Sequence, residues 1–105
     1  MYNNELKLAF YLLGHQHTLM AKLLKALRNN PDNEFIREQF TNAEQQYIKT
    51  CDRARMLLDK MEHETIRLGL QFRYINRISW AEIIALLGDE NVEARCMEFL
   101  KGAKR

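Results

Sequence analysis

FRYINRISWAEIIALLG, the stretch from Phe72 to Gly88, indicates where the short helices of this chain begin and end. Ser79 followed by Glu82 matches a capping box, in which the serine oxygen accepts from the Glu82 amide and the carboxylate accepts from the Ser79 amide. A helix is therefore expected from Trp80, and Gly88 tolerates the left-handed conformation just past a helix end. The apolar residues between them recur at helical spacing, namely Ile83, Ile84 and Leu87.

A second amphipathic segment, from Val92 to Leu100, follows this helix after a very short connection. A short capped helix, a tight turn and a second helix are the order of the helix-turn-helix motif that reads DNA. Capping boxes also begin many helices of ordinary helical bundles, so this pattern alone is equally consistent with a bundle that does not bind DNA.

Several short motifs in this region resemble a known family. They are Arg73-Tyr74-Ile75, Ser79-Trp80 with Glu82-Ile83, Leu87-Gly88, Val92 and Leu100. The region is similar to the C-terminal domain of small phage transcriptional regulators of the RinA and ArpU type, a domain that itself resembles region 4 of bacterial sigma factors. The resemblance implies a DNA-binding protein of phage or prophage origin that acts on transcription inside the bacterial host, with a helical hairpin ahead of its DNA-binding unit.

The connection between the two short helices departs from that family. Fewer residues separate Gly88 from Val92 than the family usually has, and the segment 89–100 carries four acidic side chains against Arg95 alone. Carboxylates close to DNA phosphates are repelled. The outward face of the second helix is expected to carry Glu90, Ala94, Met97, Glu98 and Lys101. This mixed surface suits a protein partner at least as well as DNA.

Two long helices are expected to form an antiparallel hairpin in residues 1–62, ahead of a helix-turn-helix-like unit in residues 63–105, which gives an all-α fold. Apolar residues recur in both helices at alternating steps of four and three. The first stripe comprises Leu6, Phe10, Leu13, His17, Met20, Leu24 and Leu27, and the second comprises Ile36, Phe40, Ala43, Tyr47, Thr50, Ala54, Leu57 and Met61. Asn30 and Pro31 are expected to end the first helix and begin the second, because asparagine caps helices and proline fits the first helical position.

A further apolar stripe on the first helix predicts a homodimer. Leu12, Leu19 and Leu23 widen its apolar face beyond what one neighbouring helix covers. A second copy of the chain is the expected cover, and dimeric regulators read paired half-sites on DNA.

The segment 66–74 alternates apolar residues with polar residues or glycine, which is the period of a half-buried strand. Nothing else in the sequence offers a partner strand, and an isolated strand leaves its backbone groups unpaired. A helix that buries Leu68, Phe72 and Ile75 is therefore the prediction.

Catalytic and metal-binding patterns are missing from the sequence. It has no glycine-rich phosphate loop and no nucleophile elbow. His15 and His17 are expected on different helix faces, so they cannot bind one metal ion together. Cys51 and Cys96 lack the spacing of a zinc or redox pair, so both are expected to be small residues of the hydrophobic core. No apolar run approaches the ~20 residues of a membrane span. The prediction is a soluble cytoplasmic protein that is not an enzyme and holds no metal or cofactor.

Two functions from different classes fit these patterns. The first is a dimeric phage-type regulator that binds double-stranded DNA. The net charge of +2 makes the chain only weakly basic, so DNA binding would depend on a few cations. The candidates are Arg73, Arg77, Arg95, Lys101, Lys104 and Arg105. The second is a phage or mobile-element protein that keeps the helix-turn-helix scaffold and inhibits a host protein, through Glu90, Ala94, Met97 and Glu98.

Overall fold

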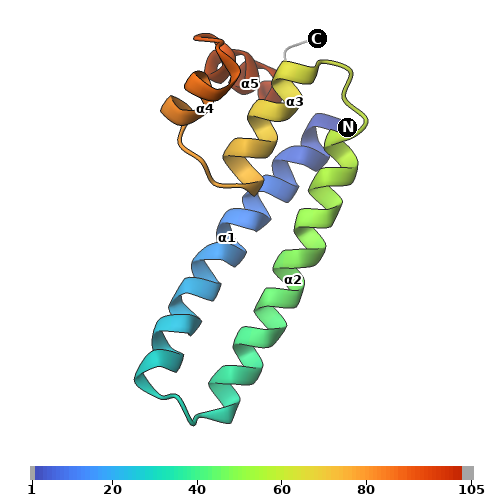
Figure 1. Cartoon of the computed structure of the whole chain (residues 1–105). Helices are drawn as coiled ribbons and strands as arrows, with labels where there is room; N and C mark the ends of the chain where they lie inside the picture. The colour runs from blue at the N-terminus through green and yellow to red at the C-terminus, as the bar shows by residue number, and fades with distance from the viewer. Residues whose placement is uncertain (1, 103–105) are drawn as a thin grey trace.

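The computed structural model describes residues 2–102, and its regular structure is helical (Figure 1). The elements are α1 (Tyr2–Asn29), α2 (Glu34–Leu58), α3 (Glu64–Leu70), the π-helical turn η1 (Gln71–Ile75), α4 (Trp80–Leu87) and α5 (Val92–Lys101). The predicted all-α fold, a long hairpin followed by short helices, is confirmed. Within residues 2–102 no helix combines the length and apolar character needed to cross a membrane.

The helices α1 and α2 lie side by side and run antiparallel (Figure 1). The turn between them differs from the prediction, because Asn33 and not Asn30 caps α2. The Asn33 side chain accepts from the Ile36 amide at 3.1 Å, and Pro31 lies in the turn ahead of the helix. Asn30 instead donates from its side chain to the Ala26 carbonyl at 3.0 Å, at the end of α1. Its amide is therefore used to close the first helix and not to begin the second.

Both apolar stripes predicted for the hairpin include residues that are not buried in the structure. α2 ends at Leu58, so Met61 lies beyond the helix and packs on the core from the following loop. His17, on the α1 stripe, is exposed, with its ring centroid 6.2 Å from that of Tyr47. The reason is that only α2 accompanies this part of α1, and one neighbour leaves much of the stripe uncovered.

The hydrophobic core lies at the end of the hairpin where α3, η1, α4 and α5 pack (Figure 1). The last buried residue of α1 is Leu13. In α2 the buried residues lie from Cys51 onward, with Ala43 as the one exception. Both cysteines are buried and free, as expected. The largest fully buried side chains are Leu6, Leu13, Leu58, Leu70, Ile83, Val92 and Cys96. Residues from all parts of the chain therefore contribute to one core.

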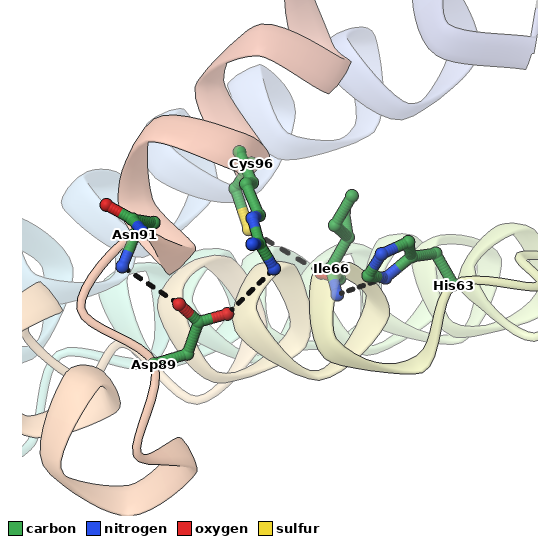
Figure 2. Close-up of polar contacts among 6 residues, drawn as sticks. His63, Ile66, Asp89, Asn91 and Cys96 are labelled. Atoms are coloured by element: carbon green, nitrogen blue, oxygen red, sulfur yellow. Dashed lines mark hydrogen bonds and ion pairs between the residues drawn. The ribbon is translucent and has the colours of Figure 1, made fainter.

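Residues 64–75 are helical despite their strand-like alternation. The His63 ring caps α3 by accepting from the Ile66 amide at 3.4 Å (Figure 2). In η1 the helix widens, because the Asn76 amide donates to the Gln71 carbonyl at 3.0 Å, five residues back. The helix was predicted, but its π-helical end was not.

The capping box at the start of α4 is confirmed with one change. Ser79 Oγ accepts from the Glu82 amide at 3.2 Å, as expected. The Glu82 carboxylate, however, accepts from the Ser79 hydroxyl at 3.2 Å instead of from the Ser79 amide. Gly88 ends α4 in the left-handed conformation with φ of 67°, and α5 begins at Val92, both as predicted.

Candidate nucleic-acid interface

The short connection between α4 and α5 is held by Asp89 (Figure 2). Its carboxylate accepts from the Asn91 amide at 2.9 Å and forms an ion pair with the Arg95 guanidinium at 3.1 Å. One of the four acidic charges in this segment is therefore neutralised locally. Arg95, a predicted DNA contact, is engaged with its own turn.

Cys96 joins α5 to α3. Its thiol donates to the Ile66 carbonyl with a sulfur–oxygen distance of 3.6 Å (Figure 2). Burial, and to a smaller extent the Asp89 carboxylate, raises the pKa of the Cys96 thiol to about 11, so the thiol stays protonated at neutral pH. Cys96 and Val92 are both fully buried, so this side of α5 faces the core. Ala94 and Glu98 of α5 are exposed and Met97 is half-buried, whereas Glu90, predicted on the same helix face, is exposed in the turn before α5.

A row of aromatic rings connects the hairpin to the short helices. Phe10 of α1 stacks on Tyr74 of η1 with ring centroids 4.5 Å apart, and Tyr74 meets the edge of Trp80 at 6.5 Å. Arg73 lies over the Trp80 ring at 5.9 Å and donates to the Ile78 carbonyl at 3.3 Å. These contacts hold a cationic side chain in a defined position beside Tyr74 and Arg77.

Arg77 has an unusual backbone. Its φ of 59° places it in the left-handed region, where glycine and asparagine are common and arginine is rare. Such a conformation costs on the order of 1–2 kcal/mol and is found preferentially at functional sites. The side chain is exposed beside α1 and Tyr74. The chain thus keeps a strained arginine where a glycine would fit without strain.

Three adjoining hollows lie along α1, η1 and α5, and we call them together the basic groove. The hollows share Phe10, Tyr11, Tyr74 and Arg77 at their borders. None of the described residues that line the groove is acidic. Its cationic side chains are Lys7, Lys22, Arg73, Arg77 and Lys101.

A second groove, on the other flank of α1, is apolar and shares no lining residue with the basic groove. It runs between α1 and α2 and is lined by Leu8, Ala9 and Leu12, with the Glu5–Arg53 ion pair at its rim. The predicted dimer residues lie on or near this flank. Leu12 is exposed, Leu19 is 47% exposed and Leu23 is half-buried.

The structure therefore brings together some of the predicted DNA contacts. Arg73, Arg77 and Lys101 line the basic groove, and Arg95 does not. Lys104 and Arg105 lie outside the described residues. Sequence reasoning missed Lys7 and Lys22, whose contribution depends on α1 passing beside η1 and α5. A usable signal existed, since Lys7, Tyr11, Thr18 and Lys22 recur at helical spacing off the apolar stripe.

Among residues 2–102, no three histidine, cysteine or acidic side chains are placed so that they could hold a metal ion. Comparison of the chain with known protein families, curated proteins and solved structures finds no match. The fold and this surface define a small all-α protein with a long helical hairpin and a basic groove at one end. Its function has to be argued from that groove.

Proposed function

We propose that this chain is a DNA-binding transcriptional regulator of the phage type that its C-terminal motifs resemble, and that it acts as a dimer. The observation that carries the proposal is the basic groove. Cations from three separate segments of the chain meet there without any carboxylate among the described lining residues. Clustered cations are the electrostatic footprint of proteins that contact DNA phosphates.

The backbone at Arg77 supports this proposal. Folding tolerates a strained arginine beside the groove, although a less strained residue would stabilise the chain. The Asp89–Arg95 ion pair occupies the one cation of segment 89–100 and leaves three carboxylates there, so the basic groove, and not α5, supports the proposal. The net charge of the chain is small, so the charge that matters for binding is the local charge of the groove.

Binding to promoter DNA from the chain's own locus is expected to weaken steeply as salt is added, because phosphate contacts release counterions. Arg77→Gly removes one cation of the basic groove, and glycine readily adopts the left-handed conformation at this position. The slope of log K against log salt should therefore become shallower by about 0.9. Fluorescence anisotropy at several salt concentrations measures both effects. Lys60→Gln, which removes an exposed cation from the turn after α2, outside both grooves, is the control and should leave the slope unchanged.

The dimer part of the proposal rests on the apolar flank of α1 and on the exposed far end of the hairpin. Light scattering after gel filtration at micromolar concentration should give twice the chain mass of 12.5 kDa. Leu19→Glu, which places a charge on a 47% exposed apolar site, should shift the protein to the monomer. A mass of one chain that does not change on concentration would contradict the dimer.

The outward face of α5 favours a second candidate function, the inhibition of a host protein. Ala94 and Glu98 are exposed there, Glu90 is exposed in the turn before α5, and among residues 2–102 neither glutamate forms an ion pair. If this function is correct, Glu90→Gln with Glu98→Gln should weaken capture of the host protein, and DNA binding should be weak throughout. If the chain is a DNA-binding regulator, the same two substitutions should tighten DNA binding, since both carboxylates repel phosphates.

A further inference from the structure

We propose that α1 forms part of the DNA-contacting surface, with Lys7 and Lys22 contacting backbone phosphates of duplex DNA that lies along the basic groove. This inference rests on the proposed function and specifies which face of the molecule meets the DNA. In a helix-turn-helix protein the expected contact would be the second short helix. Here the cations of the groove place the hairpin itself against the DNA backbone.

The spacing of the two lysines fits a phosphate backbone. Both line the basic groove, and their separation along α1 corresponds to about 22 Å at 1.5 Å per residue. One strand of B-DNA carries a phosphate every ~3.4 Å along the axis but winds around it, so a straight helix of this length reaches phosphates on the two sides of a groove about 12 Å wide. Arg77 and Lys101 lie across the groove from α1. The two lysines thus lie far enough apart on one rigid helix to contact phosphates on the two sides of a DNA groove.

Polar groups between the two lysines add suitable hydrogen-bonding partners. Tyr11 is 62% exposed, and its hydroxyl lies 2.8 Å from His15 Nε2. The two rings meet edge to face with centroids 4.6 Å apart, so each holds the other in position on the helix surface. Thr18 lines the same stretch of the groove. Hydroxyl groups and cations together make most protein contacts to DNA phosphates.

The decisive experiment uses the full chain with the double substitution Lys7→Gln and Lys22→Gln. Binding of a labelled promoter duplex should weaken at least tenfold at about 0.1 M salt, and the salt slope should become shallower by about 1.8, or 0.9 for each lost phosphate contact. Lys7→Arg with Lys22→Arg keeps both charges and should retain the wild-type slope. Lys60→Gln, in the turn after α2 and outside both grooves, should bind as the wild type does. Equal melting temperatures show that all variants are folded.

Three results would overturn the inference, and they differ in whether the proposed function survives. If the double variant binds with wild-type affinity and slope while Arg95→Gln weakens binding, the DNA meets α5 and the proposed function survives. If the groove binds polyglutamate more tightly than duplex DNA, its ligand is an acidic peptide. If the wild-type chain binds every duplex no more tightly than the ~10⁻⁴ to 10⁻⁶ M of non-specific association, the proposed function fails as well.

Discussion

Leu70→Ala is expected to destabilise this protein by about 2–5 kcal/mol, because truncating a fully buried leucine removes transfer free energy and leaves a cavity. Leu70 ends α3, is 0% exposed and belongs to the core that also contains residues of both long helices. Domains of this size are stable by only about 5–15 kcal/mol, so the loss is a large fraction of the total. The melting temperature should fall by roughly 10 °C or more.

Leu86→Ala is the matched control for this experiment. Leu86 is also a leucine near the end of a short helix, but it is 64% exposed, so its truncation should change stability by no more than about 0.5 kcal/mol. Both variants must be compared at one protein concentration, since a dimer makes melting temperature concentration-dependent. Equal, small effects of the two substitutions would show that the hairpin and the short helices do not share a core.

Local signals in the sequence were sufficient to predict α4, whereas the local alternation in residues 66–74 indicated a strand where α3 forms. The Ser79 capping box and Gly88 each act through the backbone within a few residues, so their effect does not depend on the rest of the fold. Asn30 and Asn33 illustrate the limit of such signals. Both are suitable caps beside Pro31, and the side-chain contacts of the folded turn select Asn33. The π-helical turn was also beyond prediction, because no local signal marks where a helix widens.

The candidate site was only partly predictable, for a physical reason. Arg73 and Arg77 stood out because they are cations just ahead of the capping-box motif at Ser79. Lys7 and Lys22 are far from that motif in sequence and become part of the groove only when Phe10 stacks on Tyr74 and brings α1 beside η1. Arg95 was assigned from its charge alone. Its ion pair with Asp89 depends on the turn geometry, which the sequence pattern did not determine.

Gly69 marks the closest approach between α3 and α5. A Cβ atom at this position would lie 2.8 Å from Cys96 Sγ and 2.9 Å from Val92 Cγ2, closer than real Cβ contacts. Both neighbouring side chains are fully buried, so neither is free to move away into solvent. α5 would therefore have to shift outward to accommodate even an alanine.

Gly69→Ala is accordingly expected to lower stability by about 1–2 kcal/mol, because overpacking costs about 1–3 kcal/mol and the better helix propensity of alanine offsets only part of it. Gly14→Ala in α1 offers the matched control, since a Cβ there meets no atom within 4 Å. That substitution should stabilise the protein by about 0.5–1 kcal/mol through helix propensity alone. Urea unfolding with unchanged m-values measures the two opposite effects.

Adding Cys96→Ala to Gly69→Ala should recover part of the loss by removing the sulfur in the closest contact, with a coupling energy of roughly 0.5 kcal/mol or more. If Gly69→Ala stabilised the protein as Gly14→Ala does, α3 and α5 would not approach as closely as the structure shows, and the rotation of α5 that exposes Ala94 and Glu98 would have to be reassigned.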